Sequence, residues 1–235
     1  MIALITGANK GIGYQTARLL TEQDVTVLVG ARDAGRGQRA ADELGARFLQ
    51  LDVTSAESVA SAAKWIEEEY GMLDVLVNNA GVMVPQDDPA APSSTPVEAL
   101  RATYETNVFG VVAVTNAMLP LLRRAPAARI VNVSSGLASL TRLTDPQDEF
   151  WASNYLAYNS SKAALNMITV SYAKELAGTP IKVNAADPGY CATDINGHSG
   201  PRTAEQGAAV AVRLALLDAD GPTGAHLGDD GPVPW

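Results

Sequence analysis

Residues 6–13 read Thr6-Gly7-Ala8-Asn9-Lys10-Gly11-Ile12-Gly13, and they follow directly on the apolar run 2–5. Glycine in such a turn lets the backbone approach a ligand closely. A helix that begins at about Gly13 directs its free amides and the positive end of its dipole at the same point. Glycine-rich turns are common for packing reasons alone. The position of this turn, between the first strand and the first helix, is what predicts a site for the pyrophosphate of a dinucleotide.

Short apolar runs alternate with longer helical patterns along the rest of the chain. Strands are expected at 2–5, 25–29, 47–51, 73–77, 129–133, 181–185 and 225–227, and helices at 13–23, 35–44, 54–70, 96–122, 158–177 and 203–216. Strands that are apolar throughout and separated by helices indicate parallel pairing with both faces covered. The pattern predicts an α/β fold, a Rossmann-type doubly wound parallel sheet of about seven strands with helices on both faces. Since no linker interrupts it, residues 1–235 are expected to form one domain.

Two helix starts carry local signals. Thr54 and Glu57 have the spacing of a capping box. Thr95, Pro96 and Glu98 supply an N-cap, a first-turn proline and a capping glutamate, which predicts a helix from there to about residue 122. The segment 82–95 before it is rich in proline, aspartate and serine and is expected to be a loop.

Composition limits the possible partners. The formal charge of −9 argues against nucleic acid, whose binding requires lysine and arginine to neutralise phosphates. The single cysteine, Cys191, allows no internal disulfide, and with only His198 and His226 beside it a zinc site is not expected. The apolar start is too short for a signal peptide, and no uninterrupted apolar run approaches bilayer length. We therefore expect a cytoplasmic protein with no metal and no membrane contact.

The end of the second expected strand bears on the choice of dinucleotide. A carboxylate there would bind the ribose 2′-hydroxyl of NAD, but the chain has Ala31 and then Arg32. Arg32 suits a 2′-phosphate, Lys10 lies in the neighbouring turn, and Arg36 is a further candidate. Asp33 could partly neutralise Arg32, and both cations could be ordinary surface residues. Because two separate elements bring positive charge to one corner, the sequence favours NADPH.

Tyr158 and Lys162 lie four residues apart on an expected helix and so share one face. A cation beside a phenol favours the phenolate, and we expect it to lower the pKa of Tyr158. Such a phenol can act as the acid or base in carbonyl chemistry. None of the other six tyrosines has lysine at this offset, and Tyr155 has Asn159 there.

The motifs in order resemble those of the short-chain dehydrogenase/reductase family over essentially the whole chain. The matching residues are Gly7, Gly11 and Gly13, then Asn78-Asn79-Ala80-Gly81, Asn107, Ser134-Ser135, and Tyr158 with Lys162. The stretches 6–13, 31–33 and 73–81, and the tail from Pro188-Gly189 through Thr193-Asp194 to Trp235, are similar to its carbonyl-reductase-like branch. That branch uses NADPH.

The resemblance implies a role for each matching residue. Ser135 would align the substrate oxygen, Tyr158 would donate the proton, and Lys162 would bind the nicotinamide ribose. Asn107 would bend its helix and hold a water joined to the lysine. The other implied NADPH/NADP+ contacts are Gly7, Asn9, Lys10, Gly11, Ile12, Gly13, Asp52 and Val53 at the adenine, Asn79, Ala80 and Gly81 along the channel, and Pro188, Gly189 and Thr193 at the nicotinamide. From the residues alone, Ser134 is a rival to Ser135, and Asn107 would be an exposed helical asparagine.

The expected activity is reduction of a small-molecule aldehyde or ketone to an alcohol, or the reverse reaction. An epimerase or dehydratase on a related fold and a non-catalytic NADPH-binding sensor are the alternatives. The interval from Ser135 to Tyr158 is longer than in most family members and shorter than in the monomeric carbonyl reductases. Its extra residues, Asp145, Pro146, Glu149, Phe150 and Trp151 among them, would cover an association surface or form a pocket wall. A monomer is favoured and a homodimer is the alternative. Segments 82–95 and 190–202 are further pocket candidates.

Overall fold

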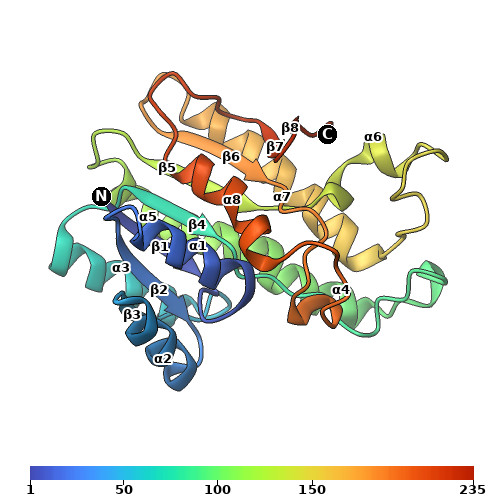
Figure 1. Cartoon of the computed structure of the whole chain (residues 1–235), viewed down its shortest axis with the longest axis horizontal. Helices are drawn as coiled ribbons and strands as arrows, with labels where there is room; N and C mark the ends of the chain where they lie inside the picture. Colours follow the sequence, from blue (N-terminus) through green and yellow to red (C-terminus); the bar gives the residue numbers. More distant parts are fainter.

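The computed structural model describes all residues, 1–235, and contains one eight-stranded sheet in the order β3-β2-β1-β4-β5-β6-β7-β8 (Figure 1). The strands are β1 Ile2–Thr6, β2 Thr26–Ala31, β3 Arg47–Gln50, β4 Val75–Asn78, β5 Arg129–Val133, β6 Lys182–Ala186, β7 His226–Gly228 and β8 Gly231–Pro232. Every neighbouring pair is parallel except β7 and β8. The doubly wound parallel sheet is confirmed. The eighth strand was not expected, because its two residues are too few to show an alternating pattern.

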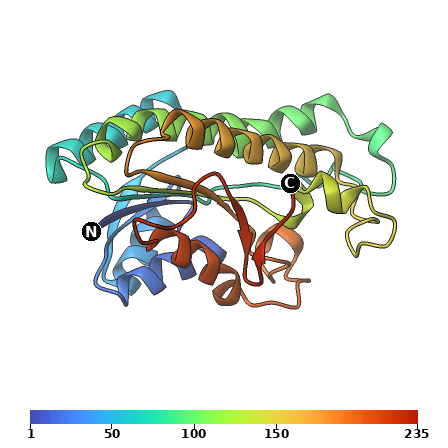
Figure 2. The ribbon, with the colours of Figure 1, turned by 90° about the horizontal axis from the view of Figure 1, so that it is seen from above.

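Helices cover both faces of the sheet, as Figure 2 shows. One layer contains α1 Gly11–Thr21, α2 Ala34–Leu44 and α8 Ala204–Ala215. The other contains α3 Ala56–Tyr70, α4 Val97–Tyr104, α5 Val111–Leu122 and the 20-residue α7 Leu156–Glu175. The short helix α6 Leu140–Leu143 lies in the segment between β5 and α7, at the same end of the molecule as α4 (Figures 1 and 2).

Two hydrophobic cores lie on opposite sides of the sheet, and alternate strand residues enter one or the other. On β1, Ala3 and Ile5 pack with α1, α2 and α8, whereas Leu4 packs with α3 and α5. Side chains of successive strand residues point to opposite faces, so a strand covered on both sides must be apolar throughout. This is why the strands appear in the sequence as continuous apolar runs.

The stretch Val97–Leu122 is one 26-residue helical unit, with the π-helical segment Glu105–Gly110 between α4 and α5. By length and mean hydropathy alone it could cross a membrane. Charged and polar residues, Glu98, Arg101 and Glu105 among them, interrupt its apolar run. Half of its apolar window is buried inside the fold, where α5 packs against α3 and the sheet. A core helix accounts for that composition.

Both expected helix caps are displaced by one residue. Ser55, not Thr54, caps α3 by accepting from the amide of Ser58, and the Thr54 hydroxyl donates instead to Asp52 Oδ1 at 2.7 Å. Pro96 occupies the N-cap position of α4 without a side-chain bond, whereas Thr95 ends a preceding 3-10 turn. Two cap-forming residues in succession look alike in sequence, and the backbone path decides which one caps.

Candidate active site

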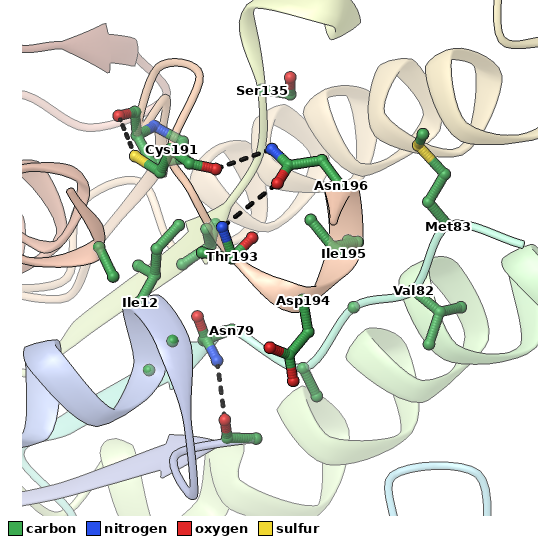
Figure 3. A pocket seen from close by; sticks show the side chains of 18 of the residues that line it. Ile12, Asn79, Val82, Met83, Ser135, Cys191, Thr193, Asp194, Ile195 and Asn196 are labelled. Atoms are coloured by element: carbon green, nitrogen blue, oxygen red, sulfur yellow. Dashed lines mark hydrogen bonds between the residues drawn. The ribbon is translucent and has the colours of Figure 1, made fainter. Parts of the chain in front are cut away.

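A cavity of about 880 Å³ opens beyond the carboxyl ends of the strands. Every residue implied above as a cofactor contact lines it, from Gly7 to Thr193, together with Ser135, Tyr158 and Lys162. Figure 3 shows one part of it, where Ile12 and Asn79 face the 193–196 turn and Val82 and Met83 lie on the other side of Asp194. The size lies within the usual range for ligand pockets, and the position is where open α/β sheets bind their ligands.

The glycine turn has the geometry that a pyrophosphate requires. Gly7 and Gly11 have φ of +65° and +58°, in the left-handed region that favours glycine. A Cβ at Gly13 would lie 2.3 Å from Nδ2 of Asn79, which itself donates to the Thr6 carbonyl at 2.9 Å. The N-cap residue of α1, Lys10, offers no side-chain acceptor to the first turn. The amides of that turn are therefore left to bind an anion in the cavity.

The corner expected to hold a 2′-phosphate keeps one of its three expected cations free of an ion pair. Arg32 lines the cavity, is exposed, and takes part in no ion pair. Asp33 caps α2 by accepting from the amide of Arg36 at 2.8 Å, and its carboxylate pairs with the Arg36 side chain. Asp33 is therefore engaged by Arg36 rather than by Arg32. Lys10 instead reaches across the crevice to Asp194, at 2.5 Å, so a phosphate would have to compete for it.

Tyr158, Lys162 and Ser135 lie together in the cavity wall. Lys162 is buried, donates to the Val133 carbonyl at 2.8 Å, and has its Nζ 5.7 Å from the centre of the Tyr158 ring. Ser134 is also buried, but its hydroxyl donates to Asn166 Oδ1 at 2.6 Å. This bond ties Ser134 to α7, which leaves Ser135 as the serine beside Tyr158.

The pKa values of the two titratable groups move in directions set mainly by burial. The pKa of Tyr158 is raised to about 12: burial raises it most, a hydrogen bond with Ser135 lowers it, and the negative charge of Asp187 also raises it. Burial lowers the pKa of Lys162 to about 8. The expectation that Lys162 lowers the pKa of Tyr158 is thus wrong for the chain by itself, because desolvation outweighs the nearby cation. At neutral pH both groups hold their protons.

Asn107 does not line the cavity; it is buried behind it, in the π-helical segment. Its side chain accepts from the Val82 amide at 2.8 Å and donates to the Val82 carbonyl at 2.9 Å and to Ser161 Oγ at 3.0 Å. Asn107 therefore fastens the start of the 82–95 segment to the helix that carries Tyr158 and Lys162. The purely local interpretation, an exposed helical asparagine, is wrong.

Asp87 is a site residue that the sequence did not reveal. It is buried, and its two carboxylate oxygens accept from the amides of Ala157 at 3.0 Å and Tyr158 at 2.8 Å. The N-cap residue of α7, Tyr155, gives no side-chain bond, so Asp87 caps this helix from seventy residues away. In sequence it is one of many polar residues in a loop, and no local signal connects it to α7.

Asp87→Ala is expected to lower the free energy of unfolding by about 1–2 kcal/mol, because two buried amides at the N-terminus of α7 lose their acceptor. Asp88→Ala is the matched control, since the Asp88 carboxylate accepts only from Ala90 in an exposed turn. It should change stability by less than about 0.5 kcal/mol. Urea unfolding measures both, and equal losses for the two variants would show that Asp87 does not cap α7.

The three segments proposed as pocket candidates all contribute to the wall. Met83 comes from the segment 82–95, Phe150 and Tyr155 from the interval between Ser135 and Tyr158, and Tyr190 and Ile195 from the segment 190–202. This wall is largely apolar and aromatic. Cys191 is buried in the same region, and burial raises the pKa of its thiol, which makes it a poor nucleophile.

A doubly wound sheet with this glycine turn, an arginine at the ribose position and a buried tyrosine–lysine pair define a dinucleotide-dependent oxidoreductase. The family model described as short chain dehydrogenase matches residues 1–204. The chain belongs to the short-chain dehydrogenase family.

Relatives and solved structures agree with this assignment. The chain is 40% identical to the short-chain dehydrogenase anuI of Penicillium roqueforti, over 91% of this chain and 88% of that protein. It is 34% identical to carbonyl reductase [NADPH] 1 of Sus scrofa, over 100% of this chain and 94% of that one. The structure of NADPH-bound carbonyl reductase from chicken fatty liver superimposes with a TM-score of 0.86 at 27% identity, over 99% of this chain and 98% of that one. These matches support the carbonyl-reductase-like branch.

Proposed function

We propose that this chain reduces the carbonyl group of a small molecule with NADPH, using Tyr158 as the proton donor. The observation that carries the proposal is the meeting of Tyr158, Lys162 and Ser135 in the same cavity as the glycine turn. Relatives named as NADPH carbonyl reductases support both the cofactor and the reaction class. Their names favour a reductase over the epimerase, dehydratase and sensor alternatives.

The residues divide the chemistry among them. NADPH supplies the hydride when it is bound. Ser135 donates a hydrogen bond to the substrate carbonyl oxygen and orients it, and Tyr158 gives its phenolic proton to that oxygen as negative charge develops there. Lys162 holds a proton at Nζ beside the phenol and, once the phenolate forms, stabilises it. Asn107 links α7 to the 82–95 segment, so that the phenol stays beside the carbonyl oxygen.

The cofactor contacts follow from the cavity wall. The amides of the first turn of α1 suit the pyrophosphate, Arg32 suits the 2′-phosphate, and the carboxyl ends of β4 and β6 carry the residues proposed for the channel and the nicotinamide. Three expectations stay predictions: that residues 1–235 form one domain, that the protein is cytoplasmic, and that it is a monomer.

A screen of NADPH oxidation over aldehydes, ketones and quinones tests the proposal. We expect carbonyl-dependent oxidation with at least one class and formation of the corresponding alcohol. A chain that binds NADPH tightly but oxidises it with no carbonyl compound would favour the sensor alternative.

Arg32→Asp is expected to raise the Kd for NADPH by about 10- to 100-fold without raising the Kd for NADH. The variant loses a charge-assisted phosphate contact and gains an acceptor for a ribose hydroxyl. Fluorescence titration of both cofactors measures the change. Arg39→Asp makes the same charge change on α2 but outside the cavity. Equal effects from the two variants would show that the overall positive charge of this region, and not direct contact with Arg32, favours NADPH.

A further inference from the structure

Asp187 is a buried carboxylate in the cavity wall that the mechanism above does not use. It follows β6 directly and precedes Pro188, and only 9% of its surface is exposed. One oxygen, Oδ1, accepts from the Gly189 amide at 3.0 Å and forms a local turn. The other oxygen, Oδ2, accepts no hydrogen bond from the protein. Oδ2 itself keeps access to solvent, and Asp187 lines the cavity, so a donor inside the cavity can reach this oxygen.

The unused oxygen lies beside the residue that follows Ser135. A Cβ on Gly136, the residue after Ser135, would lie 3.0 Å from Asp187 Oδ2 and 2.5 Å from the ring of Phe150. The absence of a side chain at Gly136 thus leaves room for the carboxylate and the aromatic ring beside the catalytic serine. The charge of Asp187 is near enough to Tyr158 to raise the pKa of its phenol.

Other groups around Asp187 do not satisfy Oδ2. On β7, His226 is buried, its ring stacks on Trp235, and its Nδ1 lies 3.4 Å from Asn166. Its Nε2 is buried without a partner and does not bond to Asp187. Arg202 pairs with Asp229. A hydrogen-bond donor for Oδ2 would therefore have to come from the cavity.

We propose that Asp187 Oδ2 recognises a hydrogen-bond donor on the substrate, a hydroxyl or ammonium group on the carbon next to the carbonyl that is reduced. Ser135 and Tyr158 then hold the carbonyl oxygen while Asp187 holds the neighbouring donor. The aromatic side chains of Phe150, Tyr155 and Tyr190 line the same cavity and suit a substrate whose carbonyl carries an aryl group. The inference rests on the proposed function, and it names α-hydroxy and α-amino ketones as the preferred substrates of the same site.

The test compares 2-hydroxyacetophenone with propiophenone, which carries a methyl group where the first has its hydroxyl. For the parent chain, kcat/KM is expected to favour the hydroxy ketone by about 10- to 100-fold, the range of one charge-assisted hydrogen bond. Asp187→Leu keeps the branch at Cγ but replaces both acceptor oxygens with methyl groups, and it should reduce this preference to less than about threefold. Asp187→Asn keeps an acceptor for Gly189, guards against misfolding of the leucine variant, and should lower the preference at least threefold because an amide is a weaker acceptor than a carboxylate.

Three results would overturn the inference. The first is a parent chain without preference for the hydroxy ketone, and the second is a preference that survives in both variants. The third is a loss that appears equally as a weaker Kd for NADPH in fluorescence titration, which would assign Asp187 to the nicotinamide carboxamide. If neither ketone supports NADPH oxidation, the substrate class is wrong, and if simple aldehydes fail as well, the proposed function fails with it.

Discussion

Tyr158→Phe is expected to lower kcat for carbonyl reduction by about 10²- to 10⁴-fold while NADPH still binds. The change removes one oxygen atom and with it the proton that the substrate oxygen must receive. Tyr158 holds that proton firmly, since burial raises its pKa to about 12, and it releases it only as charge develops on the substrate. Steady-state NADPH oxidation measures kcat, and fluorescence titration measures cofactor affinity separately.

Tyr172→Phe is the control for this variant. Tyr172 lies on the same helix, outside the cavity, and its hydroxyl donates to Asn116 at 2.7 Å. Loss of that partly exposed bond should leave kcat within about twofold of the parent, since it touches no reacting group. A Tyr158→Phe enzyme as fast as the Tyr172→Phe enzyme would remove Tyr158 from the reaction.

Lys162→Met is expected to lower kcat by about 100-fold and to change the pH profile. Lys162 has a pKa of about 8, so its ammonium is present below that pH and is lost as the pH rises through it. Reduction by the parent should therefore fall above about pH 8. Tyr158, with a pKa of about 12, stays protonated over that range. Methionine has a similar length and no charge, so the variant should lose this basic limb as well as rate.

Lys174→Met is the control. It removes a charge from the exposed last turn of α7 and should keep both kcat and the decline in rate above about pH 8. Rates measured across neutral and alkaline pH distinguish the two variants. A basic limb near pH 8 that persists in Lys162→Met would have to belong to another group, and Lys162 would then have no part in the proton's path.

The sequence predicted the elements that are governed by local patterns. The bounds of β5 were predicted without error, and the glycine turn, Arg32 and the Tyr158–Lys162 spacing lead to the same cavity. These features are visible because a covered parallel strand is apolar throughout and a helix repeats its faces every three to four residues.

What the sequence could not predict depends on contacts between distant segments. Asp87 reaches the first turn of α7 across seventy residues, and Asp187 differs from an ordinary turn aspartate only through the surroundings of Oδ2. The direction of the pKa shift at Tyr158 could not be predicted from the sequence either. The spacing of Tyr158 and Lys162 shows a nearby cation, but the depth of burial, which dominates, is a property of the folded chain.

The choice between Ser134 and Ser135 was also beyond local reasoning. Both follow β5, and only the Ser134–Asn166 bond shows which hydroxyl is committed to α7. A residue directly after a parallel strand is well placed to enter a site, but the twist of the chain decides which of two neighbours does so.

The most direct measurement follows the hydride and the proton donor together. The chain and its Tyr158→Phe variant are each mixed with an equimolar amount of NADPH that carries deuterium at the transferring position of C4, then with a carbonyl substrate, and the alcohol is analysed by mass spectrometry. The account predicts one deuterium on the carbinol carbon of the parent's product, and a variant that binds the cofactor but forms that alcohol at least a hundred times more slowly. An alcohol without deuterium, or one formed by the variant at the parent's rate, would contradict it.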